Sequence, residues 1–291
     1  METINKTQML NSAEMMERAG LNWKVLQAPV LFEGNGLSEF DGKRVNYRSD
    51  NGQGLGIVSP TYKIVQNSTA FAFLDSFLGD EIESYVKAGQ YKGGSQIYLR
   101  AKLPGSLTFA KNPDDKGEKF VDFFTSHDGS IALEVSIMAF RLVCSNGLKA
   151  FRKLSTVRVK HTLNMSLSHV KAELGLIQEQ FDIMERLSEK MAGQPVSKDR
   201  LTSILESVGA VPKEDKRSTR ALNIIDEVSR LFDRGRGTNL QNVRGTAWGA
   251  YNAITEYVDH YRGSDVLKRQ ESAAVGSGAR IKERALEVLS A

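Results

Sequence analysis

The chain has 291 residues, of which 41% are hydrophobic and 25% charged, a composition typical of globular proteins and not of disordered ones. No apolar run approaches the roughly 18 residues that a membrane-spanning helix requires, so we expect no membrane partner. The single cysteine excludes an internal disulfide, and the four histidines show no metal-ligand spacing, so neither a metal nor another cofactor is predicted. Because the first residues lack an apolar signal segment, a cytoplasmic protein is predicted.

The first half of the chain alternates short runs of β-branched and aromatic residues with glycine-bearing turns, a pattern typical of hairpins in an antiparallel sheet. Strands are predicted at Lys24–Phe32, Arg44–Arg48, Ile82–Lys87, Gln96–Leu103, Phe120–Ser126 and Ile131–Cys144. One helix interrupts them, with Asn67 or Ser68 as its N-cap and a stripe of apolar residues that stops at Gly79. We expect this helix to lie on one face of the sheet, and Lys111–Lys119 to form a polar loop.

In the second half, apolar residues recur at helical spacing, and glycine or proline residues separate the segments. Helices are predicted at Ser166–Met191, Lys198–Val208, Lys216–Arg234, Val243–Tyr261 and Ala279–Leu289. The segment Ser272–Gly278 is rich in small residues and is expected to be a flexible joint. The predicted fold class is α+β, with an antiparallel sheet and a packed helix in residues 1–160 and a helical domain in residues 161–291.

The most unusual feature is a stretch without acidic residues between Glu134 and Glu173, in a chain with 39 basic and 35 acidic residues. Cations without interspersed acids suit a phosphate backbone, because they neutralise it and release its counterions, while nearby Ser, Thr and Asn side chains donate to phosphate oxygens. The candidate contact residues are Arg141, Lys149, Arg152, Lys153, Arg158 and Lys160. The alternative is an ordinary solvated basic surface where a strand meets a helix.

Two tyrosines form a second candidate feature. Tyr91 and Tyr98 lie around Lys92-Gly93-Gly94 and could stack on bases, as aromatic residues do in proteins that bind single strands, with Lys92 as an added cation. The simpler interpretation is that both tyrosines are half-buried packing residues of a strand. Further basic residues within Lys213–Arg220 and Arg230–Arg244 could form a second patch along the same groove.

Catalytic arrangements find less support. Ser126-His127-Asp128-Gly129-Ser130 contains the ingredients of a nucleophilic triad, but neighbours in a turn point apart, and Asp-Gly is an ordinary hairpin signal. Cys144 could pair with His161, yet it ends an apolar strand, where a free cysteine belongs to the core. A metal-dependent nuclease stays an open alternative, because it could be built from the scattered carboxylates of Asp122, Asp128 and Glu134. With no P-loop or dinucleotide fingerprint either, a binding protein is predicted and not an enzyme.

Four stretches, in order along nearly the whole chain, resemble the phage- and plasmid-borne family called domain of unknown function 932. They are Gly20–Trp23, Gly56–Asn67, His127–Ser130 leading to Arg141–Leu148, and Gly245–His260. The departures are small: Asn22 stands where the family often has Asp, and Asn146-Gly147-Leu148 where it often has Asn-Thr-Leu. The order of strand, hairpin and helix around Tyr62–Leu103 is also loosely similar to single-strand annealing proteins of the eukaryotic recombination-mediator and phage Red-beta types.

The resemblance implies a protein of mobile elements, encoded near recombination or single-strand-binding genes, and so points to DNA in the cytoplasm of a host cell. The predicted function is single-stranded DNA binding or annealing in recombination or replication, without sequence preference. By analogy with annealing proteins, the chain is predicted to assemble into homo-oligomeric rings or filaments. The alternative is a protein-interaction module with which a mobile element acts on host defence or replication, with the helical half as its docking surface.

Overall fold

The structure is a computed structural model that describes residues 11–78, 82–143, 146–149, 156–159 and 177–291, and for 77–78, 146–149 and 156–159 it describes the backbone. The chain forms two compact units. Unit 1 is built from residues within 1–104, 120–136 and 156–174, and unit 2 from residues within 105–119, 137–155 and 175–291. This division differs from the predicted one because strands of the first half contribute to both units. The predicted boundary at residues 160 and 161 lies outside the described residues.

A three-stranded antiparallel sheet in unit 1 has the order β1-β2-β3, with β1 at Val25–Glu33, β2 at Leu37–Arg48 and β3 at Gly54–Val58. Strand β3 was not predicted, because glycines interrupt its apolar pattern. The glycine at position 56 is required by packing, since a Cβ there would lie 2.4 Å from the Cβ of Asp128.

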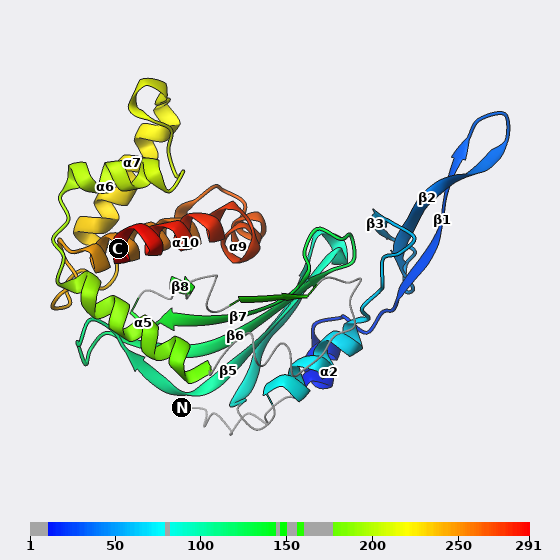
Figure 1. Cartoon of the computed structure of the whole chain (residues 1–291), viewed down its shortest axis with the longest axis horizontal. Coiled ribbons are helices and arrows are strands. Elements are labelled where there is room, and N and C mark those ends of the chain that lie inside the picture. The colour runs from blue at the N-terminus through cyan, green and yellow to red at the C-terminus, as the bar shows by residue number, and fades with distance from the viewer. Residues whose placement is uncertain (1–10, 79–81, 144–145, 150–155, 160–176) are drawn as a thin grey trace, which may run out of the picture. The chain divides into compact units, whose positions relative to one another are not determined.

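The outer part of the β1–β2 hairpin, residues 29–43, projects beyond β3 as a two-stranded arm (Figure 1). Its register pairs Leu31 with Glu39 and Glu33 with Leu37, so the two leucines share one face of the arm. Phe32 and Phe40 lie on the other face, with their ring centroids 6.4 Å apart. These four side chains are between 50% and 73% exposed, so the arm presents apolar groups to solvent on both faces.

The second sheet has six strands in the order β4-β5-β6-β7-β8, and β9 also pairs with β7. The strands are β4 (Ser84–Tyr91), β5 (Gln96–Thr108), β6 (Lys116–Ser126), β7 (Leu133–Arg141), β8 (Asn146–Lys149) and β9 (Thr156–Val159). The predicted α+β class with antiparallel pairing is confirmed. The predicted polar loop at Lys111–Lys119 is shorter than expected, because β6 already begins at Lys116.

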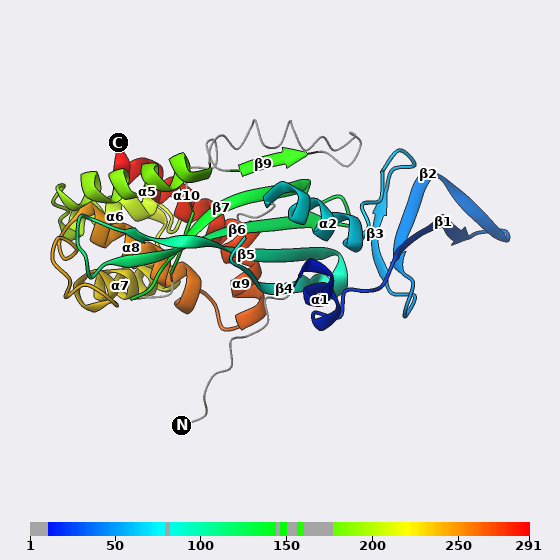
Figure 2. The same ribbon diagram turned by 90° about the horizontal axis from the view of Figure 1, so that it is seen from below.

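Two helices pack on unit 1, namely α1 (Ser12–Arg18) and α2 (Asn67–Leu78) (Figure 2). The predicted helix is α2, and its Phe73 ring lies 6.3 Å from that of Phe123 on β6, so it covers the apolar face of the sheet as expected. Asp75 on α2 accepts hydrogen bonds from the hydroxyls of Ser12 and Tyr85, which ties α1, α2 and β4 together.

The helices of unit 2 surround α8, whose ten residues are all buried. Contacts with α5, α7, α10 and β8 explain this burial, and the polar residues of α8 form hydrogen bonds inside the unit. The helices are α5 (Ile177–Ala192), α6 (Lys198–Ser207), α7 (Thr219–Arg234), α8 (Ala247–Glu256), α9 (Val266–Val275) and α10 (Ser277–Ser290), and a π-helical turn, Tyr257–Tyr261, follows α8. Among the described residues, no helix has the length and apolar character needed to cross a membrane.

The predicted flexible joint at Ser272–Gly278 was wrong: Ser272 to Val275 end α9, and α10 begins at Ser277. The small residues serve close packing. A Cβ at Gly278 would lie 2.8 Å from Val258 Cγ1, and the Ser272 hydroxyl accepts hydrogen bonds from the Gly278 amide at 3.1 Å and from Arg262 Nη1 at 2.8 Å. The small side chains therefore allow α9 and α10 to pack closely against the π-helical turn Tyr257–Tyr261.

Candidate functional site

Most of the predicted cationic segment cannot be placed at side-chain level. Lys149 lies on β8 and Arg158 on β9, where the structure describes the backbone, and Arg158 is the register partner of Glu134. Three further predicted residues lie outside the described residues: Arg152, Lys153 and Lys160. The proposed cationic track through these side chains therefore stays a prediction.

Arg141 is the exception, and the prediction that it contacts phosphate was wrong. Its side chain and that of Asp115 are both 0% exposed and form an ion pair through two contacts, one of them 2.7 Å between Arg141 Nη2 and Asp115 Oδ2. A guanidinium that is buried and neutralised by a carboxylate has no surface left for a polyanion. The prediction failed because the acid that pairs with Arg141 lies outside the acid-free stretch. This acid, Asp115, comes from the turn before β6.

On the face of the second sheet opposite α2, unit 1 carries a row of aromatic and basic side chains. Tyr91 on β4 and Tyr98 on β5 stack on each other, with ring centroids 5.0 Å apart and an angle of 26° between the rings. Lys87 Nζ lies 5.7 Å from the centre of the Tyr98 ring, and Phe124 on β6 continues the row 6.2 Å beyond Tyr98. We call Lys87, Tyr91, Tyr98 and Arg100 the tyrosine strip.

The register of β4 and β5 builds this strip. Lys87 pairs with Arg100, and Gly89 pairs with Tyr98, so their side chains share one face. A Cβ at Gly89 would lie 2.7 Å from the Tyr98 hydroxyl oxygen, so the glycine gives the tyrosine ring room to lie across β4. Both tyrosines remain partly exposed. The structure thus brings Tyr91 and Tyr98 together, and one face of each ring is occupied by the other ring.

Arg100 and Asp122 set the electrostatics of the strip. Arg100 Nε and Nη2 contact the two carboxylate oxygens of Asp122 at 2.5 and 2.6 Å, a bidentate pair in which Asp122 is buried and Arg100 is 21% exposed. Partial burial, reinforced by the Arg100 guanidinium, lowers the pKa of Lys87, and Asp122 opposes this effect. Asp122 thus neutralises Arg100, and Lys87 adds its charge to the strip.

Lys92 lies at one end of the strip, in the turn between β4 and β5. It is exposed and has a φ of 51°, and Gly93 follows with a φ of 66°. A Cβ at Gly93 would lie 2.2 Å from Gln53 Nε2, and one at Gly94 3.0 Å from the Trp23 ring, so both glycines are needed for close packing of this turn. The turn therefore holds Lys92 at the surface beside Tyr91.

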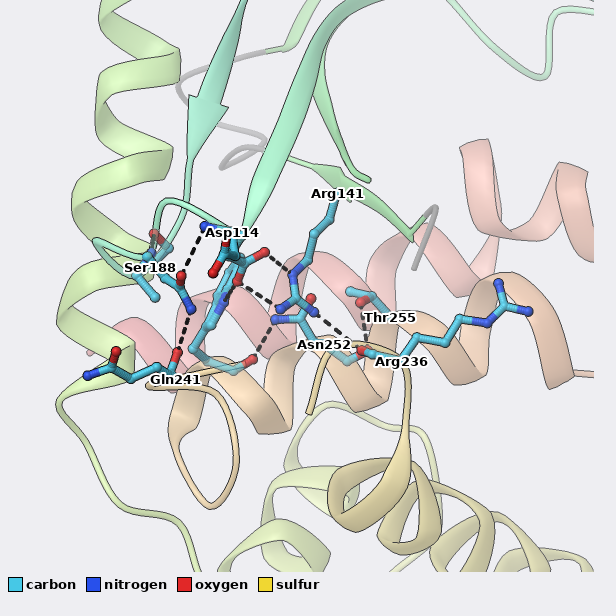
Figure 3. A network of polar contacts seen from close by, with 11 residues as sticks. Asp114, Arg141, Ser188, Arg236, Gln241, Asn252 and Thr255 are labelled. Carbon is cyan, nitrogen blue, oxygen red and sulfur yellow. Dashed lines mark hydrogen bonds and ion pairs between the residues drawn. The ribbon is translucent and has the colours of Figure 1, made fainter. Parts of the chain in front are cut away.

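A polar network in the interior of unit 2 was missed by the sequence analysis (Figure 3). Besides Arg141, Asp115 accepts a hydrogen bond from Trp248 Nε1 at 3.0 Å, and the Arg141 guanidinium carbon lies 5.8 Å from the centre of the Trp248 ring. The turn before β6 also bonds to the helical part of the chain, because Asn112 Nδ2 donates to the Gln241 carbonyl at 3.0 Å. Asp115 is thus a buried centre that joins β7 to α8.

The same network reaches the turn after α7. Arg141 Nη1 approaches the carbonyl of Arg236 at 3.5 Å, and Glu256 Oε2 on α8 accepts the Arg236 amide at 3.1 Å. Glu256 is buried, and this desolvation raises its pKa, while the Arg236 amide and guanidinium oppose the effect. In the sequence, Glu256 stands four residues from Asn252 and from His260, a spacing that already favoured a packed polar contact.

The catalytic alternatives find no support in the geometry. His127 is buried, its Nε2 lies 2.9 Å from Asn67 Oδ1, and its ring meets that of Trp23 edge-on at 5.5 Å. Asp128 Oδ1 accepts the Ser130 amide at 2.8 Å, which is a hairpin turn and not a triad. Within the described part of the chain, no three His, Cys, Asp or Glu side chains group as metal ligands. Cys144 and His161 lie outside it.

Residues 54–285 match the model of a family described as domain of unknown function (DUF932), and the chain belongs to this family. The match includes three of the four stretches on which the resemblance was based, and two of these supply Arg141, Trp248 and Glu256 to the network of unit 2. No curated protein and no solved structure matches the chain. The similarity to annealing proteins therefore stays a prediction.

Proposed function

We propose that this chain is a non-catalytic protein of a phage or plasmid that binds single-stranded DNA without sequence preference and anneals complementary strands during recombination or replication. The observation that carries the proposal is the tyrosine strip. It places two stacked, partly exposed aromatic rings beside an exposed lysine on one face of the sheet in unit 1.

Such a face suits single strands because every base has a flat aromatic surface, whereas its hydrogen-bonding edges differ. A base that stacks on the outer ring would extend the aromatic row formed by Tyr91, Tyr98 and Phe124. Lys87 and Lys92 would neutralise the phosphates on either side of the stacked base, which makes binding dependent on salt. The cations of the acid-free stretch would add to this attraction.

The proposal is tested by measuring binding to a labelled oligothymidine by fluorescence anisotropy. The measurement is made between about 50 and 200 mM salt, a range over which proteins that contact several phosphates lose much of their affinity. We expect Tyr98→Leu to weaken binding about five- to 150-fold, since stacking of one base contributes about 1 to 3 kcal/mol. Tyr98→Phe should retain most of the affinity. Tyr47→Leu, a half-buried tyrosine of β2, is the matched control. If the wild-type chain does not bind the oligonucleotide at the lowest salt concentration, the proposal is wrong.

Annealing is tested separately. Two complementary strands, one carrying a fluorophore and the other a quencher, should pair faster with the chain than without it. Tyr98→Leu should remove this acceleration. Binding without acceleration would retain the DNA-binding proposal and discard annealing. Incubation of the labelled strand with magnesium or manganese tests the nuclease alternative, which predicts shorter products.

Self-assembly, predicted from the sequence as homo-oligomeric rings or filaments, is the second candidate property, and the arm favours it. Contiguous exposed apolar groups are rare on monomers, and a two-stranded ribbon is only marginally stable alone. Because the arm is apolar on both faces, it suits an assembly in which copies of this chain flank it on each side. Light scattering should then show an oligomer that Phe32→Ser with Leu37→Ser converts to a monomer. A monomeric wild-type chain at micromolar concentration would discard this candidate.

A further inference from the structure

The turn Gly235-Arg236-Gly237, which follows α7, is packed against the buried network of unit 2. A Cβ at Gly235 would lie 2.4 Å from the Leu231 carbonyl oxygen and 2.8 Å from Glu256 Oε2. Gly237 has a φ of 76°, and a Cβ there would lie 2.6 Å from Val143 Cγ1. Neither position can carry a side chain without a shift of its neighbours, so this turn requires glycine on both sides of Arg236.

The backbone of Arg236 is held from both sides by buried charged groups. Its amide donates to Glu256 at 3.1 Å, and its carbonyl lies 3.5 Å from Nη1 of Arg141, which Asp115 holds in turn. Burial of these charges is costly, and in some proteins such pairs are kept for the geometry that they fix. What they fix here is the position at which the Arg236 side chain leaves the protein.

The Arg236 side chain points away from the network and is exposed (Figure 3). Among the described residues its guanidinium contacts no carboxylate. Glu256 accepts the backbone amide of Arg236, and its carboxylate also interacts electrostatically with the Arg236 guanidinium. Arg230 lies nearby, with its guanidinium carbon 5.6 Å from the centre of the Tyr261 ring, and Tyr261 is 43% exposed. Glu227 pairs with Arg230 at 2.6 and 2.9 Å, whereas the Arg236 guanidinium has no such ion pair among the described residues.

We infer that Arg236 is a phosphodiester-binding residue, fixed at the surface of unit 2 by Glu256, Arg141 and the two glycines. The inference rests on the proposed function and adds to it a second contact with the nucleic acid, on the unit that does not carry the tyrosine strip. Arginine suits this role because its planar fork of donors meets two phosphate oxygens at once.

The test compares Arg236→Ala with Arg234→Ala in the oligothymidine assay. Arg234 is the matched control, since it is an exposed arginine at the end of α7, two residues earlier, and the same charge is removed. We expect Arg236→Ala to weaken binding about tenfold or more and to reduce the slope of log K against log salt by about 0.7, the value for one phosphate on a single strand. Arg234→Ala should have a much smaller effect.

The possible outcomes separate the two proposals. Arg236→Lys should recover part of the affinity, because it keeps the charge but loses the fork. Equal effects of Arg236→Ala and Arg234→Ala, with Tyr98→Leu still weakening binding, would overturn the inference and leave the proposed function standing. Absence of binding by the wild-type chain would overturn both. Thermal melting of each variant identifies any loss of affinity that comes from unfolding.

Discussion

Both units contain a bidentate arginine–aspartate pair in which the aspartate is buried, and the surroundings of these two pairs differ. Arg141 and Asp115 in unit 2 are both fully buried, and their remaining atoms contact Trp248 and the Arg236 carbonyl. Arg100 in unit 1 is 21% exposed and pairs with a buried Asp122 beside two tyrosines. The same chemistry therefore fixes an interior in one unit and tunes a surface in the other. The exposure of the arginine distinguishes the two roles.

Removal of one partner of the buried pair should have the largest effect. Asp115→Ala or Arg141→Ala leaves a charge in the interior without its counter-ion, so we expect a loss of about 3 to 5 kcal/mol in the free energy of unfolding. Arg141→Lys should also be destabilising, because an ammonium group cannot make the two parallel contacts. Denaturant unfolding followed by circular dichroism measures these changes, and a loss below about 1 kcal/mol would contradict the assigned role.

Removal of Asp122 should cost less, about 1.5 to 3 kcal/mol for a hydrogen bond to a charged group, because Arg100 can turn towards solvent. The double variant Arg100→Met with Asp122→Leu should recover most of this loss, since Arg100 is partly exposed and a methionine can replace its aliphatic stem. The matching variant Arg141→Met with Asp115→Leu should not regain the lost free energy of unfolding, because Trp248 Nε1 and the Arg236 carbonyl lose their partners. Equal recovery in both units would contradict the comparison.

The smallest effect concerns Glu256 and depends on pH. Burial raises its pKa above the ordinary 4.5, so the folded state binds a proton that the unfolded state releases. This contribution to stability is fully present below the unfolded pKa and is lost as the pH rises through the folded pKa. Glu256→Gln keeps an acceptor for the Arg236 amide and does not titrate. We therefore expect the variant to gain stability relative to wild type between pH 4 and pH 7 (about the range in which a raised carboxyl titrates), measured by thermal melting. A constant difference would contradict the raised pKa.

The fold was largely accessible from local pattern. Alternation of apolar residues located six of the strands in the two sheets, and helical periodicity located α2, α5, α6, α7, α8 and α10. Strand β3 and helix α9 were missed for one reason: their glycine, alanine and serine residues read as turns or joints when considered alone. Close approach of neighbouring elements requires such small residues, and no local pattern reports that approach.

The candidate site was only partly accessible. Tyr91 and Tyr98 were identified by composition, and the strand period of two would have added Arg100 to their face. Arg236 stands between two glycines, which predicts a turn. This local pattern does not indicate that Glu256 and Arg141 contact the backbone of the turn. Nothing near Asp115 in the sequence indicates that it neutralises Arg141, because the two residues meet only when β7 packs beside the turn that precedes β6.

The sequence alone determined the α+β class, the family, and the excess of cations between Glu134 and Glu173. These depend on composition and on neighbours along the chain. The tertiary structure decided which charges remain available, since a side chain's charge matters to a ligand only after its own partners are known. Arg141 was a candidate by sequence and is buried and neutralised, whereas Arg236 belonged only to a possible second patch and is held at the surface.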